Sequence, residues 1–414
     1  MPPSQSTHVI VVGAGAAGVF GAIACAAASP TTVHLFEAGQ APLTKVRISG
    51  GGRCNVTHAC FDPAVLVTHY PRGSRALRGP FTQFQPKDTI AWFQRRGIAL
   101  KTEADGRLFP TTDDSATIVE GLLGEARRLG VVLHLGQAVT GITHQGQGFT
   151  VAVKGETAWC CERLLLATGS SALGYRLAVS LGHTLVPPVP SLFTFTVADP
   201  ALRALAGVSV ADVTLTLHLD SGKPLKQRGP LLVTHWGLSG PAILKLSAFG
   251  AVDLHRQRYR ASLGIHWVPE LSQDQVRQRL LSLKQDHGKR LVVSFSPFPT
   301  LSRRLWQYLL QHRVGLDRDL TWANLSKAHL QTLVTELTQG RYAIAGRGVF
   351  KDEFVTCGGV ALREVDFKTM ESRRCPGLYL AGELLDIDGI TGGFNFQNAW
   401  TTGWLAGRAM ARAE

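Results

Sequence analysis

A glycine pattern near the start of the chain constrains the fold more than any other feature. Gly13-Ala-Gly-Ala-Ala-Gly18 joins an apolar segment, Val9–Val12, to an alanine-rich run, and Glu37 ends the next apolar segment. Glycines at these positions allow a tight strand-to-helix turn and let a pyrophosphate approach the helix N-terminus, while the acid binds a ribose hydroxyl. We therefore predict a dinucleotide-binding α/β domain with ligand contacts from Gly13, Gly15, Ala16, Ala17, Gly18, Glu37 and Ala38.

A second glycine-rich segment, Ser49-Gly-Gly-Gly-Arg-Cys-Asn55, follows soon after this acid. A NAD dehydrogenase has no need of such a loop here, whereas in two-dinucleotide-fold flavoproteins the chain at this point runs along FAD towards the isoalloxazine. The glycines offer unobstructed backbone N–H groups to phosphate or flavin oxygens. The segment favours tightly bound FAD over NAD as the resident cofactor, with contacts from Lys45, Arg47, Ser49, Gly50, Gly51, Gly52, Arg53 and Asn55.

Two later segments also combine a predicted buried strand with a glycine turn. Arg163–Gly169 is predicted to be a buried strand ending in Ala-Thr-Gly, and Pro376–Glu383 a short buried strand ending in a Gly-Glu turn. A glycine-rich turn after Asp386 and Asp388 then leads into an amphipathic helix, whose N–H groups and dipole suit the pyrimidine edge of a flavin. The two aspartates are expected to cap this loop or to position substrate, and Glu383 to orient FAD. Further predicted cofactor contacts are Ala138, Val139, Ala167, Thr168, Gly169, Gly382, Glu383, Gly392, Gly393, Phe394 and Asn395.

The middle of the chain changes pattern twice. Three prolines within 187–190 are expected to end the first domain, because they interrupt both helices and strand ladders. Alternating apolar residues then predict antiparallel strands, and from Ser272 the period is helical. Gly106–Pro110 is predicted to be a loop near the substrate side. The predicted domains are residues 1–190 (first part of the FAD-binding domain), 191–271 (inserted antiparallel β domain), 272–340 (helical subdomain) and 341–414 (return to the FAD-binding domain).

Composition limits the surroundings and partners of the chain. The 414 residues include 43 Lys and Arg against 30 Asp and Glu, a formal charge of +13 that favours encounters with polyanions, above all nucleic acid. A device for solubility is the alternative explanation. The seven cysteines lack zinc-binding spacing, so we expect no metal site and reduced thiols in the cytoplasm. The apolar run from Val9 lacks a basic n-region and is explained by the glycine pattern, so no membrane segment is predicted.

Taken together, these residues resemble a bacterial family of NAD(P)/FAD-dependent oxidoreductases. It contains proteins described as aminoacetone oxidases, bile-acid enone reductases and ribosomal RNA dihydrouridine synthases. The resemblance spans nearly the whole chain and is carried by 45–55, 106–110, 234–241, 355–360 and 377–397. It implies a Rossmann-like FAD domain with an inserted β-barrel-like domain and a small helical domain. One departure is the short segment Ala167–Tyr175, which in the family pattern is a longer loop near the cofactor.

Three functions follow as hypotheses. The first is reduction of a conjugated C=C bond with NADH or NADPH as transient reductant, the best substrate being uridine in ribosomal RNA. The second is a small-molecule enzyme, either an amine oxidase using O2 or an enone reductase. The third is a flavin-containing RNA-binding factor without turnover. Cys54 and His235 are the candidate proton donors, each with a structural role as its alternative; Arg53 is expected to lower the Cys54 pKa. The oligomeric state is left open.

Overall fold

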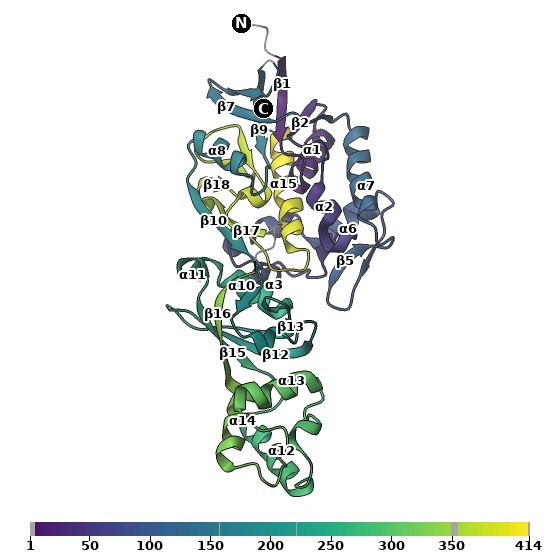
Figure 1. Ribbon diagram of the computed structural model, residues 1–414. Helices are drawn as coiled ribbons and strands as arrows, with labels where there is room; N and C mark the ends of the chain where they lie inside the picture. Colours follow the sequence, from purple (N-terminus) through teal and green to yellow (C-terminus); the bar gives the residue numbers. More distant parts are fainter. Residues whose placement is uncertain (1–4, 157, 221, 349–354, 413–414) are drawn as a thin grey trace. The chain divides into compact units, whose positions relative to one another are not determined.

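The computed structural model describes residues 5–412 except 157, 221 and 349–354. The chain divides into two compact units (Figure 1). Unit 1 combines Met1–Pro188 with Thr356–Glu414, and unit 2 is Val189–Val355. The chain therefore leaves unit 1 once and returns to complete it.

Unit 1 is built on a largely parallel sheet. Its central strand pairs in parallel with a neighbour on each side, and Val9, Ile10 and Val11 of that strand are fully buried. Strands buried on both faces read as continuous apolar runs, which explains the pattern in the sequence. In spatial order the strands are β18 (Val365–Asp366), β19 (Glu371–Ser372), β20 (Leu378–Leu380), β9 (Trp159–Leu166), β1 (Gln5–Val12), β2 (Val33–Glu37) and β6 (Val132–Leu135), with β8 (Gly148–Val153) pairing β9 and β7 (Val139–Gln145) pairing β8.

The parallel pairing brings several predicted residues to one edge of this sheet. β1 is parallel to β2 and β9, and β20 is parallel to β9. Their carboxyl ends therefore lie at the same edge, which is where ligands bind in open α/β sheets. Gly13 follows β1, Glu37 ends β2, Ala167 follows β9 and Ala381 follows β20.

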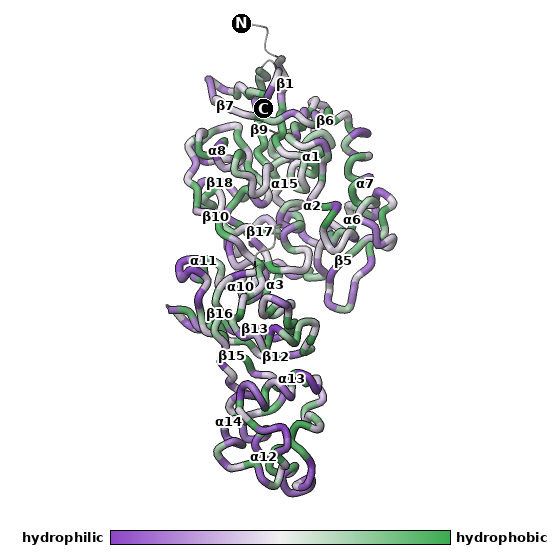
Figure 2. Tube along the Cα trace, viewed as in Figure 1, coloured by the Kyte–Doolittle hydropathy of each residue, from purple (hydrophilic) through white to green (hydrophobic). Residues whose placement is uncertain are grey.

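Two helices from opposite ends of the chain pack closely in unit 1. A Cβ on Gly403 would lie 2.4 Å from the Ala17 carbonyl oxygen, and one on Gly407 would lie 2.2 Å from that of Gly21. Glycine is therefore required for this contact between α1 and α15. Figure 2 colours α1 mainly as apolar, whereas α15 contains both polar and apolar residues. The helices of unit 1 are α1 (Ala16–Ala28), α2 (Thr44–Ile48), η1 (Ser49–Gly52), α3 (Pro63–Leu66), η2 (Val67–His69), α4 (Ser74–Leu77), α5 (Pro80–Gln83), α6 (Pro86–Gln94), α7 (Ser115–Arg128), α8 (Ala172–Ser180), η5 (Leu362–Glu364), η6 (Gly382–Leu384) and α15 (Phe394–Arg412).

Two expectations about local structure were wrong. Gly106–Pro110 is not a loop: Arg107–Pro110 is β5, which pairs with β3 (Thr57–His58) and β4 (Leu100–Thr102) and buries Phe109. The prolines of 187–190 do not interrupt the ladder, because they lie within β10 (Leu185–Ser191). Among the described residues β10 pairs only with β17 (Val355–Val360), in a two-stranded sheet, and proline is tolerated in such edge strands.

Unit 2 contains a closed six-stranded barrel, which confirms the predicted β-barrel-like insertion. Burial alternates along the barrel strands, as in β16, so one side chain in two faces the interior. The strands are, in order, β11 (Phe195–Val197), β14 (Gly237–Ser239), β13 (Leu225–Val233), β12 (Ser209–His218), β15 (Ala261–His266) and β16 (Gly340–Arg347). The helices are α9 (Pro200–Arg203), α10 (Pro241–Phe249), α11 (Ala251–Arg256), α12 (Gln273–Asp286), η3 (Val292–Ser294), α13 (Arg303–Tyr308), the π-helix η4 (Leu309–Val314) and α14 (Lys327–Gln339).

A buried carboxylate on α7 gives unit 1 a predictable response to acid. Glu125 accepts hydrogen bonds from Arg128 (2.8 Å) and Arg96 (2.6 Å). The Arg128 hydrogen bond, followed by that of Arg96, lowers the Glu125 pKa from 4.5 to about 2. A carboxylate whose pKa is lower in the folded than in the unfolded protein stabilises the fold at a pH above its unfolded-state pKa. This stabilisation is lost as the pH falls towards the folded-state pKa. Glu125→Gln should therefore be less stable than wild type at pH 7, and the difference should shrink between pH 4.5 and 2 in thermal melts. A pH-independent difference would contradict this role.

Candidate cofactor and active site

The glycine-rich turn between β1 and α1 leaves an unobstructed helix N-terminus. Gly13 has φ +102°, and a Cβ there would lie 2.6 Å from the Ala167 carbonyl oxygen. A Cβ on Gly18 would lie 1.9 Å from the Gly13 carbonyl oxygen, so these two glycines are required by packing. Gly15 is different: nothing lies within 4 Å of a Cβ built there, and no side chain caps α1. The first N–H groups of α1, which include Ala16 and Ala17, therefore face open space suited to an anion.

Glu37 is fixed beside this turn. Its carboxylate accepts hydrogen bonds from the backbone N–H groups of Ala14 and Gly39, both at 2.8 Å. The same residue lines a cavity of about 120 Å³ at the carboxyl edge of the sheet. Five predicted residues line it, namely Gly13, Glu37, Ala38, Val139 and Thr168. Ala138 does not line it; its carbonyl oxygen accepts a hydrogen bond from the Lys154 backbone N–H (2.9 Å).

Sequence reasoning missed several residues of this cavity. They are Val12, Phe36, Gln137, Ser171, Leu173, Gly174 and Leu177. Ser171 caps α8, and its side chain accepts a hydrogen bond from the Gly174 N–H. Ser171, two residues after Ala-Thr-Gly, is an N-cap signal, and it was the available clue that a helix starts here. The apolar members carry no comparable signal, because they are indistinguishable in sequence from core residues.

A second group of predicted residues meets at the Gly-Glu turn after β20. Lys45 Nζ lies 2.6 Å from Glu383 Oε2, and a Cβ on Gly169 would lie 3.8 Å from that same oxygen. Gly382 has φ +72°, and a Cβ there would lie 2.8 Å from Ala17 Cβ. The turn is thus held against the first turn of α1. Three segments distant in sequence therefore converge near the N-terminal end of that helix, which no side chain caps.

The triple-glycine segment meets the N-terminus of α15. Gly50, Gly51 and Gly52 all have positive φ, and nothing lies within 4 Å of a Cβ on Gly51 or Gly52. The Asn55 side chain accepts a hydrogen bond from Gly393 N (3.0 Å), and a Cβ on Gly393 would lie 2.7 Å from the Thr57 backbone. The two glycine-rich segments predicted to approach a flavin therefore lie side by side. The Ser49 hydroxyl donates to Val46 O, and the Arg47 backbone oxygen accepts from Ser115.

Some predicted contacts are engaged within the protein. The Arg53 guanidinium pairs with Glu103 (2.7 Å) and stacks over Phe109 (3.9 Å). The Asn395 amide donates to Gly389 O and accepts from Gly389 N, so it closes the loop before α15. The side chains of Arg53 and Asn395 thus shape the site, which leaves their backbone for ligand contact. The Phe394 ring stacks on both His58 and His69, which also contact each other. A Cβ on Gly392 would lie 2.8 Å from the Phe394 ring.

The two aspartates before α15 have different surroundings. Asp388 is fully buried and forms an ion pair with Arg72. Asp386 accepts a hydrogen bond from Gly358 N (3.1 Å), and burial raises its pKa. Both carboxylates therefore hold the loop, as the capping expectation proposed.

Cys54 differs from expectation in its ionisation. The side chain is fully buried and the backbone has φ +61°. Burial raises the Cys54 pKa to about 12, so the expected shift towards thiolate was wrong. The Arg53 charge does not reverse this, because that guanidinium is neutralised by its carboxylate partners.

This burial leads to a prediction about Cys54. Cys54→Ala should slow product formation by less than about tenfold, whereas loss of a general acid costs roughly 100- to 10,000-fold. Steady-state turnover at matched flavin content measures the effect. A loss above 100-fold with normal flavin content would make Cys54 catalytic.

His235 lies in unit 2, apart in the chain from the other predicted residues. It is exposed on the turn between β13 and β14, where the Thr234 hydroxyl accepts hydrogen bonds from the backbone of Trp236 and Gly237. The neighbouring Trp236 side chain is also exposed. The exposure of His235 neither supports nor excludes contact with a substrate, so its role as a proton donor stays a prediction.

The comparisons with known proteins match this architecture. Residues 7–409 match the family described as HI0933-like protein Rossmann domain. The chain belongs to this family. It is 32% identical over 419 residues to a ribosomal RNA dihydrouridine synthase of Escherichia coli (strain K12), covering 98% of each protein. It is 31% identical to a 3-dehydro-bile acid delta(4,6)-reductase of Clostridium scindens, covering 97% of this chain and 98% of that one.

A solved structure shows the same fold. A 3-ketosteroid-delta4-(5alpha)-dehydrogenase from Rhodococcus jostii RHA1 superposes with a TM-score of 0.54 at 15% identity, over all of this chain and 98% of that one. The HI0933-like family and these neighbours confirm two predictions: a Rossmann-type domain with an inserted barrel, and an FAD-dependent oxidoreductase. No helix among the described residues is both long and apolar enough to cross a membrane.

The residues of this HI0933-like protein fit FAD. The Thr168 hydroxyl and the Tyr175 hydroxyl are buried without a hydrogen-bond partner among the described residues. Both belong to the segment after β9, where the cavity is lined by Thr168. Unpaired buried hydroxyls are costly, and a bound polar group removes that cost. The open α1 N-terminus, Glu37 and the glycines of η1 supply the anion, ribose and close-contact surfaces that FAD needs.

Proposed function

We propose that this protein is a flavin-dependent reductase of a conjugated C=C bond. NADH or NADPH is the transient reductant, and uridine in ribosomal RNA is the substrate. The observation that carries the proposal is the 32% identity, over 98% of both chains, to a ribosomal RNA dihydrouridine synthase. The bile-acid reductase relative supports the reaction type.

The two relatives' substrates share one reactive unit. Uracil carries a C5=C6 bond conjugated to its C4 carbonyl, and an enone carries the same C=C–C=O unit. Bound FAD would supply the chemistry of hydride transfer, from NAD(P)H to the carbon distal to the carbonyl. The neighbouring carbon takes a proton. The balanced reaction converts uridine, NAD(P)H and H⁺ into dihydrouridine and NAD(P)⁺.

The protein's part is to hold and orient. The α1 N-terminus, with no side-chain cap, would bind the pyrophosphate, and Glu37 would bind ribose. The N-terminus of α15 would place positive dipole charge at the flavin edge where negative charge develops on reduction. Reacting atoms must be held about 3–3.5 Å apart, and the rigid packing of glycines against backbone supplies that precision.

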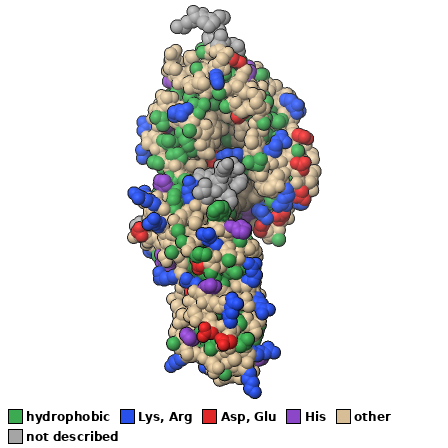
Figure 3. Space-filling model, in the orientation of Figure 1, with side chains coloured by type: hydrophobic (Ala, Val, Ile, Leu, Met, Phe, Trp, Pro, Cys, Tyr) green, Lys and Arg blue, Asp and Glu red, His purple; other side chains and the backbone are tan. Residues whose placement is uncertain are grey.

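The charge of the chain supports an RNA substrate independently. A formal charge of +13 exceeds what two FAD phosphates neutralise. On the face drawn in Figure 3, Lys and Arg side chains are spread over the surface of both units. Phosphate contacts supply most of the affinity of proteins for nucleic acid and make it depend on salt.

Mass spectrometry of RNA nucleosides tests the proposal. Protein-free ribosomal RNA lacking dihydrouridine is incubated with the FAD-loaded protein and NADPH or NADH, then digested. We expect dihydrouridine to appear at one or a few positions with the reductant and not without it. If NAD(P)H is oxidised in the presence of this RNA but no dihydrouridine forms, the result would contradict an RNA substrate.

Reduction of a small enone is the second candidate, favoured by the 31% identity to the bile-acid reductase. It predicts NAD(P)H consumption stoichiometric with a saturated ketone and independent of RNA. Rapid flavin reoxidation by O2 with peroxide would instead indicate the amine oxidase. A protein that binds RNA but shows no turnover with any acceptor would be the non-catalytic factor.

A further inference from the structure

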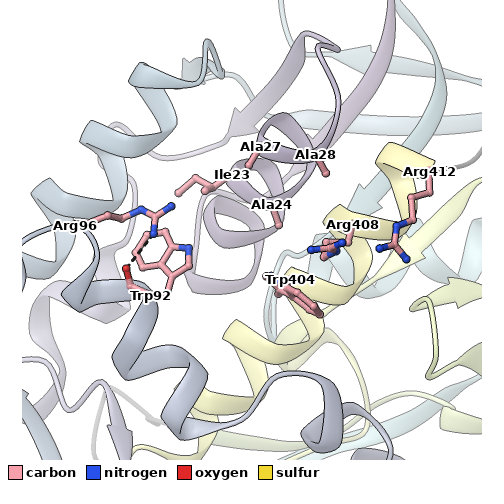
Figure 4. Close-up of a pocket in the computed structure, with 9 residues that line it drawn as sticks. All are labelled: Ile23, Ala24, Ala27, Ala28, Trp92, Arg96, Trp404, Arg408 and Arg412. Atoms are coloured by element: carbon pink, nitrogen blue, oxygen red, sulfur yellow. Dashed lines mark hydrogen bonds between the residues drawn. The ribbon is translucent and has the colours of Figure 1, made fainter.

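A groove rich in arginine and tryptophan lies in unit 1, on the outer face of α1 (Figure 4). Its volume is about 330 Å³, at the lower end for small-ligand sites. Four small or apolar residues of α1 form the floor: Ile23, Ala24, Ala27 and Ala28. Trp92 and Arg96 form one wall, and Trp404, Arg408 and Arg412 of α15 form the other.

Each wall carries an arginine stacked on a tryptophan. The Arg96 guanidinium lies 3.7 Å from the Trp92 ring centroid, and Arg408 lies 5.0 Å from that of Trp404. Stacking holds a guanidinium flat. The Arg96 guanidinium also donates to the Trp92 carbonyl oxygen (3.0 Å) and to Glu125 (2.6 Å). Figure 4 shows Arg96 and Trp92 on one side of the alanine floor, and Arg408 and Trp404 on the other.

Three arginines line the groove, and no Asp or Glu among the described residues does so. Arg96 is paired with Glu125, but within the described residues no ion pair is made by Arg408 or Arg412. These two are four residues apart on α15, so they share one helix face about 6 Å apart along the axis. That arrangement suits two neighbouring phosphate groups.

The groove is separate from the cofactor cavity. The two are lined by different residues, and the step from Gly15 to Ala27 corresponds to about 18 Å along α1. None of the groove residues is among the cofactor contacts predicted from the sequence. Its cationic walls therefore have no explanation in the chemistry of the flavin.

We propose that this groove binds the phosphodiester backbone of the RNA substrate, with Arg408 and Arg412 contacting phosphates. The inference rests on the proposed function for the identity of the polyanion. Charge complementarity favours a phosphate chain, and the open groove accepts a strand passing through it. The tryptophan faces are covered by arginine, so the contacts are to the backbone and are independent of base sequence.

Fluorescence anisotropy with a labelled 20-nucleotide single-stranded RNA tests the inference. The proteins compared are FAD-loaded wild type, Arg408→Ala/Arg412→Ala, and the control Lys154→Ala/Arg363→Ala. The control removes two exposed cations of unit 1 that lie outside the groove. Losing two phosphate contacts should lower the slope of log affinity against log salt by about 1.4, or about 25-fold in affinity at 0.1 M salt. The control should change both by much less.

Other results would overturn the inference. Equal losses in both double variants would show a diffuse charge effect. Unchanged RNA affinity with a lower melting temperature would mean that the arginines only stabilise helix C-termini. Inorganic phosphate or AMP that competes with the RNA at micromolar concentration would show a small-nucleotide site instead. Flavin reduction by NAD(P)H should stay normal in all variants. If the wild-type protein binds RNA through the groove but forms no dihydrouridine, the result would contradict the proposed function and leave the groove inference standing.

Discussion

Replacing Gly15 by valine should leave the protein folded but weaken FAD binding by about 100-fold, or about 3 kcal/mol. Gly15 has φ −82°, which valine adopts, and nothing in the protein lies within 4 Å of an added Cβ. We therefore expect the missing side chain to serve the ligand, because an added one would occupy the space in which we propose that the pyrophosphate approaches α1. Titration of the apoprotein with FAD, followed by flavin fluorescence, measures the effect.

Two glycine variants are matched controls for Gly15→Val. Gly124 on α7 also has open space around a Cβ, so Gly124→Val should bind FAD normally. Gly18→Val should lose the fold together with the flavin, because its Cβ would lie 1.9 Å from the Gly13 carbonyl oxygen. Urea unfolding of apoprotein separates the two outcomes, with Gly15→Val within about 1 kcal/mol of wild type. Normal FAD affinity in Gly15→Val would place the pyrophosphate elsewhere.

Replacing Arg72 by alanine should destabilise the protein by about 3–5 kcal/mol. Asp388 is fully buried, and Arg72 donates two hydrogen bonds to its carboxylate in a bidentate pair. Loss of the guanidinium leaves that carboxylate in a low-dielectric site without its cation. Since Asp388 lies in the loop leading to Gly392 and Gly393, flavin affinity should fall as well. Urea unfolding followed by circular dichroism at pH 7 measures the stability.

An exposed ion pair is the control for Arg72→Ala. Arg373 lies 3.6 Å from Asp366, and both side chains are more than one third exposed. Exposed pairs contribute about 0–1 kcal/mol, so Arg373→Ala should have a small effect. The double variant Arg72→Met/Asp388→Leu should recover much of the lost stability, because it removes both buried charges. A loss below 1 kcal/mol in Arg72→Ala would show that the pair is dispensable.

The sequence predicted those features of the fold that repeat locally. A strand, a turn and a helix within 30 residues dictate the pattern of Val9–Val12, Gly13–Gly18 and Glu37. The structure has β1, α1 and β2 at these positions. Barrel strands were predicted from alternation, as in 213–219, which lies mainly in β12. These patterns report burial on one or both faces, which is a local property of the chain.

Features that depend on distant partners were not predictable. The strand at 107–110 forms because β3 and β4 flank it. The prolines of β10 are accepted because, in the described part of the chain, β17 is the one strand that pairs with it. The Cys54 pKa depends mainly on burial, which cannot be read from the sequence next to Cys54. The groove walls at Trp92 and Trp404 come from helices far apart in sequence, so no motif marks them.

Anaerobic reduction and reoxidation of the flavin tests the central claim most directly. The FAD-loaded protein is bleached with NADPH or NADH, and unmodified ribosomal RNA or an enone is then added without O2. An RNA reductase predicts that RNA restores the oxidised flavin spectrum and that dihydrouridine forms in equal amount. Bleached flavin that RNA leaves unchanged, and that only an enone or O2 reoxidises, would contradict the proposed substrate.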